Sequence, residues 1–419
     1  MTNPTIDAII FDYGGVLVRT VDPTPRRELE RRFDLSLGAA DDIVFRSPRW
    51  DDVQHGRIDD ADFWRDVGER LNLDAEELED FRRGFWSGDR LDEALVDVIR
   101  HLAGEGYRTA LLSNAPGALR SYIEELGIAD AFEVIVISAE EGLVKPTPEI
   151  YERVLERLDV AAERAVFIDD MRSNVEAARR VGLHATRFRG PAPLRVWLRD
   201  LGLPVPEPER QLVPDLEAVI FDWGGVMEGL PEEEDVLAWE RRLALETGAL
   251  PEILWGETWR RLEVGAITDA DYARHVAERL GLPDRDAALH FFQQFYTSDR
   301  LNQTVVDAAR ELRERYKVGL LSNAFPTQRE VIREHHDIDV DGIFDVYVNS
   351  SAVGLSKPNP EIYNLTLERL DVAPERAVFL DDSLRNVDSA RHMGLHAIQF
   401  VNPEVSLAAL EEVLGHAIS

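Results

Sequence analysis

The chain has 419 residues, with 47 basic against 80 acidic residues, a formal net charge of −33 and no cysteine. This charge makes nucleic acid and anionic membranes unfavourable partners, and the lack of cysteine excludes disulfides and cysteine nucleophiles. A single core stops growing at roughly 250–300 residues, so two domains are expected. No apolar run approaches the ~20 residues of a membrane span, and the N-terminus lacks a basic leader region. We therefore predict a cytoplasmic protein.

The sequence contains two copies of one long repeat. The repeated segments include AIIFDYGGVL at 8–17 with AVIFDWGGVM at 218–227, and ERAVFIDD at 163–170 with ERAVFLDD at 375–382. A repeat of this length indicates a duplicated domain instead of a solenoid. The proline-rich segment 204–216 is typical of an extended linker. We predict one domain over 1–203 and a second over 217–419.

Each copy alternates apolar runs with helical patterns, which predicts an α/β fold with a mostly parallel sheet wrapped by helices. The strand candidates of the first copy are AIIF, TALL, VIVI and AVFI. Residues of about 20–88 and 229–298 have helical periodicity without strand alternation, and we predict that they form a helical cap in each copy. A further helix is predicted from Pro148, with Ile150, Val154, Leu155 and Leu158 on one face.

Asp12 and Asp222 follow directly on the first strand of each copy and precede a Gly-Gly pair. Ligands of open α/β sheets bind at the carboxyl ends of strands, so both carboxylates are expected at the binding edge. The glycines would let the backbone approach a ligand closely. The alternative is an aspartate that merely starts a turn.

Two serine-asparagine pairs, Ser113-Asn114 and Ser322-Asn323, follow the second strand of each copy. A hydroxyl and successive backbone N–H groups at this place can bind phosphate oxygens. A serine that caps a helix or starts a turn is the alternative.

Lysine is rare, since Lys145, Lys317 and Lys357 are the only three in the chain. Lys145 and Lys357 occupy the same place in the two repeats, although arginine is used almost everywhere else. This pattern indicates that a compact ammonium group is required there, and a counter-ion for phosphate fits this need. Inheritance of one ancestral surface lysine is the alternative.

Paired acids, Asp169-Asp170 and Asp381-Asp382, close the fourth predicted strand. A second carboxylate facing the first is what a hard cation such as Mg²⁺ prefers. Helix capping explains one acid of each pair better than both.

In this order the motifs resemble those of the haloacid dehalogenase-like hydrolase superfamily, in the branch with a helical cap after the first motif. The resemblance covers nearly the whole chain, twice. It implies two Rossmann-like domains in tandem, in which Asp12 and Asp222 attack phosphorus and form a phospho-aspartate. The paired acids favour the magnesium-dependent phosphatases over the metal-free dehalogenases of this superfamily.

The resemblance also implies roles for the remaining site residues. Mg²⁺ would be held by Asp12, the Gly14 carbonyl and Asp170 in the first copy, and by Asp222, the Gly224 carbonyl and Asp382 in the second. Asp169 and Asp381 would lie outside the ligand set or bind weakly. Phosphoryl oxygens would be bound by the site serines and lysines, with Asn174 and Asn386 orienting the lysine or a metal-bound water.

The sequence departs from the resemblance at one position. Phosphatases of this family usually carry an aspartate two residues after the nucleophile, which protonates the leaving group, but here Gly14 and Gly224 stand there. General acid-base catalysis is worth ~10²–10⁴ in rate. Hydrolysis would be slowed least for substrates whose leaving groups need no proton, such as acyl phosphates, anomeric sugar phosphates or diphosphates.

Six of the eight tryptophans lie in or beside the predicted caps, namely Trp50, Trp64, Trp86, Trp239, Trp255 and Trp259. Core packing explains them first, and an apolar substrate group second. The sequence thus predicts a Mg²⁺-dependent phosphohydrolase for a small phosphorylated or diphosphorylated metabolite. Two alternatives stay open: a protein that binds or ionises a diphosphate on an apolar, prenyl-like substrate, and a non-catalytic pseudo-enzyme whose copies form an intramolecular pseudo-dimer.

Overall fold

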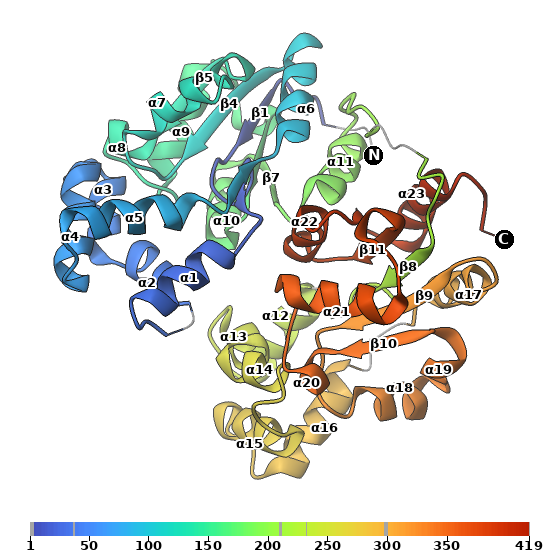
Figure 1. The fold of residues 1–419 in the computed structure, drawn as a ribbon. Helices are drawn as coiled ribbons and strands as arrows, with labels where there is room; N and C mark the ends of the chain where they lie inside the picture. Colours follow the sequence, from blue (N-terminus) through green and yellow to red (C-terminus); the bar gives the residue numbers. More distant parts are fainter. Residues whose placement is uncertain (1–3, 37, 209–211, 232, 297–300, 419) are drawn as a thin grey trace. The chain divides into compact units, whose positions relative to one another are not determined.

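The computed structural model describes residues 4–36, 38–208, 212–231, 233–296 and 301–418 (Figure 1). The chain separates into two compact units, residues 1–208 and 209–419. The predicted linker 204–216 spans this division, and its residues 209–211 lie outside the described part of the chain. The same holds for residues 232, 297 and 298 of the predicted second cap.

In the first unit two strands are followed by five helices, after which strands and helices alternate. Its strands are β1 (Ala8–Phe11), β2 (Val18–Thr20), β3 (Asp89–Leu91), β4 (Arg108–Ser113), β5 (Val134–Ile137), β6 (Ala165–Asp169) and β7 (His184–Arg187). Its helices are α1 (Thr24–Arg32), α2 (Ala39–Phe45), α3 (Pro48–Gln54), α4 (Asp60–Leu71), α5 (Ala75–Trp86), α6 (Glu93–Gly104), α7 (Leu119–Glu125), α8 (Ser138–Glu141), α9 (Pro148–Leu158), α10 (Arg172–Val181) and α11 (Pro191–Asp200).

The second unit repeats this order. Its strands are β8 (Ala218–Phe221), β9 (Lys317–Ser322), β10 (Val346–Asn349), β11 (Ala377–Asp381) and β12 (His396–Gln399). Its helices are α12 (Glu233–Arg242), α13 (Ala249–Trp255), α14 (Glu257–Leu262), α15 (Asp269–Leu280), α16 (Arg285–Phe295), α17 (Gln303–Leu312), α18 (Gln328–His336), α19 (Val340–Ile343), α20 (Ser350–Val353), α21 (Pro360–Leu370), α22 (Leu384–His392) and α23 (Pro403–Leu414). None of the helices within the described residues is long and apolar enough to cross a membrane.

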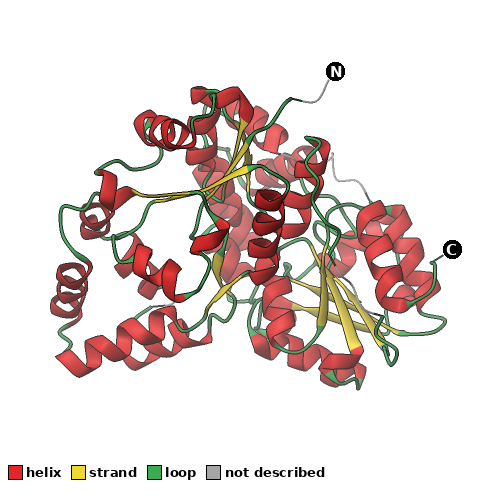
Figure 2. Cartoon of the chain, turned by 90° about the horizontal axis from the view of Figure 1, so that it is seen from above, coloured by secondary structure: helices red, strands yellow, loops and turns green. Residues whose placement is uncertain are grey.

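Each unit is built on a five-stranded parallel sheet. The strand order is β5-β4-β1-β6-β7 in the first unit and β10-β9-β8-β11-β12 in the second. Both faces of the second sheet are covered, because Val219 and Phe221 pack in one hydrophobic core while Ala218 and Ile220 pack in another. Figure 2 shows helices on both sides of these strands. The predicted α/β fold, present twice, is confirmed.

Four of the five strands of the first sheet were predicted from the sequence, whereas β7 and its counterpart β12 were not. The missed strands, β7 and β12, lie at a sheet edge. Their sequences, HATR and HAIQ, are only partly buried and contain no apolar run. Strands that are buried on both faces give a continuous apolar signal, whereas half-exposed edge strands do not.

The register of the sheet fixes where the candidate residues meet. Phe11 of β1 is paired with Leu111 of β4 and with Ile168 of β6. The next residues along these three strands are Asp12, Leu112 and Asp169, which therefore meet at the carboxyl edge of the sheet. Phe221 is paired in the same way with Leu320 and Leu380 in the second unit.

Helices α1–α5 occupy the segment that was predicted as the first cap, and α12–α16 occupy the second (Figure 1). The tryptophans of these segments pack mainly into the caps' own aromatic cores. Trp64, for example, is 5% exposed and contacts Phe63 and Phe85 edge to face. Trp86 is an exception, since 38% of it is exposed beside the exposed Phe45.

The loop after α3 rests on the edge of the sheet. Gly56 has φ +67°, and a Cβ atom there would lie 2.2 Å from the carbonyl oxygen of Ala139 in α8. The corresponding Gly265 approaches the Ser351 carbonyl oxygen to the same degree, at 2.3 Å. Only glycine allows both this backbone conformation and this contact. The cap is thus seated against the carboxyl edge in both copies.

Candidate active site

Lys145 lies at the centre of the first cluster. Its Nζ atom donates to Asp12 Oδ1 at 2.8 Å, to Asp169 Oδ2 at 2.7 Å and to the Leu112 carbonyl oxygen at 3.0 Å. Its side chain is only 1% exposed. An ammonium group has three donors, so each of them has an acceptor. The lysine therefore holds the carboxylates of two strands together.

Lys357 repeats this arrangement in the second unit. Its Nζ atom contacts Asp222 Oδ1 at 2.8 Å, Asp381 Oδ2 at 2.7 Å and the Leu321 carbonyl oxygen at 3.0 Å. The duplication thus extends from the sequence motifs to the geometry of the side chains.

The second acid of each pair completes a cluster. Carboxylate oxygens of Asp12, Asp169 and Asp170 lie within 4.8 Å of one another. Asp170 lies against Gly15, where φ is +78° and a Cβ atom would be 2.5 Å from the Asp170 Cγ. The second glycine of the Gly-Gly pair is therefore required for this close approach. Asp222, Asp381 and Asp382 form the matching cluster.

Asn174, in the first turn of α10, contacts Asp169. Its Nδ2 atom donates to Asp169 Oδ1 and Oδ2 at 3.0 and 3.1 Å, and the Met171 backbone N–H donates to Asp169 Oδ1 at 2.8 Å. Asn174 thus acts on Lys145 through the aspartate between them. Asn386 donates to Asp381 at the same two distances.

The two members of each serine-asparagine pair have different surroundings. Asn114 is fixed to the main chain of Lys145, because its Nδ2 atom donates to the Lys145 carbonyl oxygen and its Oδ1 atom accepts from the Lys145 N–H, both at 2.8 Å. Asn323 holds Lys357 in the same way, at 2.9 and 2.8 Å. These side chains position the lysine loops, so a phosphate contact by either asparagine would have to come from its backbone.

The first cluster holds three carboxyl groups against one ammonium, all in low-dielectric surroundings. Burial raises the pKa of Asp12 to about 8, despite the opposing effect of Lys145 and with a further rise from Asp169. Burial, followed by the charge of Asp169, also raises the pKa of Asp170. Burial alone would lower the pKa of Lys145, but Asp12 and Asp169 raise it above its ordinary value. The lysine is therefore charged, and Asp12 and Asp170 retain their protons to higher pH than ordinary carboxyl groups.

The second cluster behaves alike. Burial raises the pKa of Asp222 well above its usual range, against the effect of Lys357. Burial and the neighbouring Asp381 raise the pKa of Asp382 to about 7. Both clusters thus set three carboxyl groups against one lysine and retain protons that a divalent cation would replace, which is the electrostatic setting that such a cation fits.

Replacing Lys145 by methionine should destabilise the fold, because it leaves Asp12 and Asp169 buried without a counter-charge. Removing one partner of a buried ion pair costs about 3–5 kcal/mol. The free energy of unfolding, measured with urea, should fall by this amount. Lys317→Met is the matched control, since the Lys317 side chain is 45% exposed and its loss should cost at most about 1 kcal/mol. Equal losses in the two variants would contradict this account of Lys145.

Sequence reasoning missed two groups at these sites. One is the carbonyl oxygen that completes each lysine's contacts, at Leu112 and Leu321, because main-chain groups leave no signal in a sequence. The other is Glu263 at the end of α14. Its carboxylate accepts hydrogen bonds from Ser356 and Trp259 and interacts electrostatically with Lys357. Burial raises the pKa of Glu263. Only alignment of the two copies, which places Gln54 at this position, could have pointed to it.

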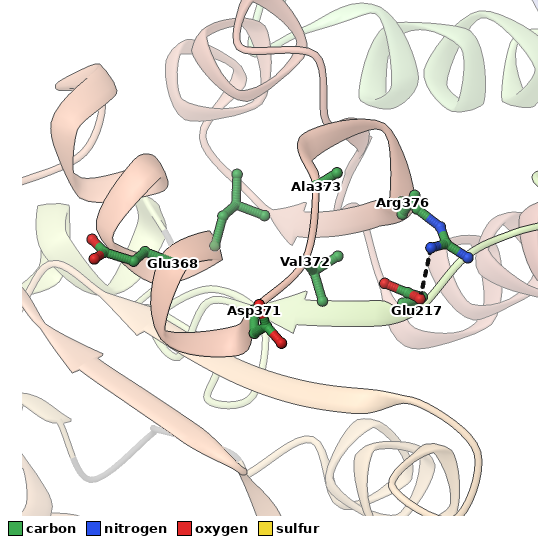
Figure 3. Close-up of a pocket in the computed structure, with 7 residues that line it drawn as sticks. Glu217, Glu368, Asp371, Val372, Ala373 and Arg376 are labelled. Carbon is green, nitrogen blue, oxygen red and sulfur yellow. Dashed lines mark ion pairs between the residues drawn. The ribbon is translucent and has the colours of Figure 1, made fainter.

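A separate surface hollow of about 290 Å³ lies elsewhere in the second unit (Figure 3). It is lined by Glu217, Leu367, Glu368, Asp371, Val372, Ala373 and Arg376, and an ion pair of 2.8 Å joins Arg376 to Glu217. These residues precede β8 and β11, whereas the acidic cluster follows the same strands. The hollow is therefore at the opposite edge of the sheet and is no part of the candidate site.

Two parallel-sheet units, each with an acid-lysine cluster at its carboxyl edge and a helical cap, define a duplicated α/β protein with a candidate cation and anion site in each copy. The model of the haloacid dehalogenase-like hydrolase family matches residues 6–182 and 216–394. The chain belongs to this family. The two matched regions contain every candidate site residue from Asp12 to Asn174 and from Asp222 to Asn386.

Individual relatives match about one copy. A sesquiterpene phosphatase of Aspergillus oryzae is 31% identical over 180 residues, which cover 43% of this chain and 88% of that protein. A phosphorylated carbohydrates phosphatase of Thermotoga maritima is 29% identical over 232 residues, covering 48% of this chain and all of that protein. A solved structure of a HAD family enzyme of Bacteroides thetaiotaomicron, in complex with magnesium and inorganic phosphate, is 22% identical, covers 44% of this chain and 93% of its own, and has a TM-score of 0.38.

Proposed function

We propose that each copy is a Mg²⁺-dependent phosphohydrolase that acts on a small phosphorylated metabolite through a phospho-aspartate. The observation that carries the proposal is the cluster of a strand-end aspartate, a buried lysine and a pair of aspartates, present twice with the same distances. Phosphatases among the relatives support the same reaction class.

The hydrogen bonds at Asp12 select its attacking oxygen. Oδ1 accepts from Lys145 Nζ at 2.8 Å and from the Tyr13 backbone N–H at 2.7 Å. No donor among the described residues reaches Oδ2. Two donors on Oδ1 fix the rotation of the carboxylate and leave Oδ2 to act as the nucleophile. Asp222 is held in the same way by Lys357 and the Trp223 N–H, at 2.8 and 2.7 Å.

The reaction would then take two displacements at phosphorus. In the first, Asp12 Oδ2 forms a bond to phosphorus while the bond to the leaving oxygen breaks, and this oxygen takes its proton from solvent. In the second, a water molecule attacks the same phosphorus and gives up a proton to solvent, the bond to Oδ2 breaks, and inorganic phosphate and the free carboxylate are released. Lys145 holds the carboxylate in position throughout, and the Ser113 hydroxyl is placed to donate to a phosphoryl oxygen.

The residues present fit a hard divalent cation. Asp12 and Asp170, or Asp222 and Asp382, would hold it, together with the Gly14 or Gly224 carbonyl. Their carboxylates lie within 4.8 Å of one another, and each cluster of three carboxyl groups has one lysine among them. When bound, Mg²⁺ would displace the protons of these carboxyl groups, neutralise their charge and polarise the phosphoryl group.

Stabilisation by Mg²⁺ should increase with pH. The Asp12 carboxyl has a pKa of about 8 in the folded chain against 3.8 in a free chain, so between these values the folded state holds a proton that the unfolded state has lost. The metal-free fold therefore loses stability as the pH rises through this window, and a bound cation must displace that proton. The rise in Tm caused by Mg²⁺ should be larger at about pH 8.5 than at about pH 6. An equal or smaller rise at the higher pH, with sodium chloride at matched ionic strength as control, would contradict a metal site at these carboxylates.

The relatives and the cap indicate which substrates to test. One relative is a sesquiterpene phosphatase, which supports terpenoid phosphates as candidates, and another is a phosphatase of phosphorylated carbohydrates. Most cap tryptophans are used in core packing, so they are weak support for an apolar substrate. The panel to test therefore includes sugar phosphates, acyl phosphates, and terpenoid mono- and diphosphates.

The test is phosphate release from this panel by the full chain, with Mg²⁺ and after chelation. The proposal expects release that requires the metal. Conversion of a terpenoid diphosphate without free monophosphate hydrolysis would favour the alternative in which the site ionises a diphosphate. No turnover, together with no change of Tm on adding Mg²⁺ or phosphate, would favour a non-catalytic role, because a ligand that binds only the native state must stabilise it.

A further inference from the structure

The two copies differ beside the serine of the second motif. In the second unit Gln328, Tyr347 and Asn349 lie in one hydrogen-bonded chain that ends on Ser322. The corresponding residues of the first unit are Leu119, Ile135 and Ile137, which cannot form such a chain. This replacement of three apolar side chains by three polar ones is confined to the second copy and lies at the end of its β9 and β10.

The hydrogen-bonded chain begins at backbone groups that fix which member of each pair donates. Asn349 Oδ1 accepts from the Ser351 N–H at 2.9 Å, and its Nδ2 atom donates to the Phe325 carbonyl oxygen at 3.1 Å. A backbone N–H can only donate and a carbonyl can only accept, so the Asn349 amide has one orientation. Its second Nδ2 proton then goes to the Tyr347 hydroxyl oxygen, at 2.9 Å.

This direction is passed on to Ser322. Because Tyr347 accepts from Asn349, its own proton is donated onward, to Gln328 Oε1 at 2.8 Å. Gln328 Nε2 must therefore face the serine, and it donates to Ser322 Oγ at 3.0 Å. The Ser322 proton is left to donate elsewhere, and none of the described residues accepts it. Gln328 and Ser322 are 6% and 1% exposed, so bulk water does not compete for these hydrogen bonds and reverse their direction.

We propose that Gln328 is a positioning residue that makes the Ser322 hydroxyl an obligate donor to a phosphoryl oxygen, so that the second site binds phosphate more tightly than the first. The inference rests on the proposed function, because it takes the bound group at this edge to be phosphate. Ser113 has no such partner, since no described residue hydrogen-bonds its hydroxyl. Its proton must be oriented when the ligand binds, which costs affinity.

The decisive variant is Gln328→Glu, which keeps the size of the side chain and reverses one hydrogen bond. Tyr347 can still donate to one carboxylate oxygen, but the other oxygen now accepts the Ser322 proton and turns it away from the ligand. Gln328→Leu copies the first unit and only removes the constraint. A hydrogen bond to a charged group corresponds to ~10–100-fold in affinity, so Gln328→Glu should weaken phosphate binding by that factor and Gln328→Leu by less.

The measurement is calorimetric titration of the full chain with inorganic phosphate in the presence of Mg²⁺. Wild type should show two binding events of unequal affinity, and Gln328→Glu should weaken the tighter one alone. A double-mutant cycle with Ser322→Ala separates the hydroxyl from the added charge. In the Ser322→Ala background only the added charge acts, so Gln328→Glu should weaken phosphate binding by a clearly smaller factor than it does when the hydroxyl is present, a result that a merely structural role of Gln328 would not produce.

Two results would overturn the inference. One is an unchanged affinity of both binding events in Gln328→Glu, and the other is an equal loss with and without the Ser322 hydroxyl. Turnover measured in parallel separates this inference from the proposed function. A chain that hydrolyses phosphate esters but ignores Gln328→Glu loses only the inference, and one that binds phosphate in the expected manner without turnover loses only the hydrolysis. Absence of phosphate binding at both sites would remove both.

Discussion

Asp12→Asn should abolish turnover at the first copy and Asp222→Asn should abolish it at the second, so that the rates of the two single variants add up to the wild-type rate. Asparagine keeps the oxygen that accepts from the lysine and the backbone N–H, so the fold and the lysine contacts are retained. What is lost is the anionic oxygen that attacks phosphorus. Removing a covalent nucleophile lowers turnover by on the order of 10⁵-fold, so phosphate release by the altered site is negligible compared with that of the intact site.

These variants also show how much of the total phosphate release each copy contributes. Steady-state phosphate release on each substrate gives the share of each site directly. Asp7→Asn is the matched control, because Asp7 precedes the same strand but pairs with Arg164 at the opposite edge of the sheet. If either single variant of a site aspartate retained the wild-type rate on every substrate while the other one lost all of it, only one copy would be active. If both retained it, neither aspartate would be the nucleophile.

Gly14→Asp should raise turnover of esters with poor leaving groups at the first site, by ~10²-fold or more, because it places a proton donor where this chain has glycine. The structure has room for this side chain. A Cβ atom at Gly14 would have no neighbour within 4 Å, and its φ is not in the left-handed range. The same change at Gly224 meets only Leu230, at an ordinary contact distance of 3.7 Å.

The dependence on the leaving group identifies the cause of such a gain. An alkyl phosphate needs a proton on its leaving oxygen, whereas an acyl phosphate does not, so only the former should gain from Gly14→Asp. Gly14→Asn is the control of the same size without a proton to transfer. The comparison is made in the Asp222→Asn background, where turnover comes from the first site alone. Equal kcat/KM changes for both substrates, or for both variants, would mean that proton transfer to the leaving group does not limit the native site.

Much of the fold could be predicted from the sequence, since its signals are local. The buried strands such as AIIF are continuous apolar runs, and α9 begins at Pro148 and buries Ile150, Val154, Leu155 and Leu158 as expected. The candidate residues could be placed at one edge because each follows directly on such a strand. The edge strands β7 and β12 could not be found, because half-exposed polar strands resemble loops in a sequence.

The contacts within the site were less predictable. The rarity of lysine pointed to Lys145, but its contacts with two aspartates and a main-chain carbonyl depend on the register of three strands. A phosphate contact through the backbone N–H of Asn114 stays a prediction, but the role of its side chain, which holds the lysine loop across 31 residues of sequence, left no signal in the sequence. Gln328 has no strand or motif signal of its own. Its partners become visible only when the direction of a hydrogen-bonded chain is followed through the fold.

Metal-dependent attack of the two strand-end aspartates on phosphorus is tested most directly by one measurement. It is phosphate release by wild type and by the Asp12→Asn, Asp222→Asn double variant, on the best substrate of the panel, with Mg²⁺ and after chelation. We expect release by the wild type with Mg²⁺, and none above background by the double variant or by the chelated enzyme. Wild-type rates in the double variant would contradict this mechanism.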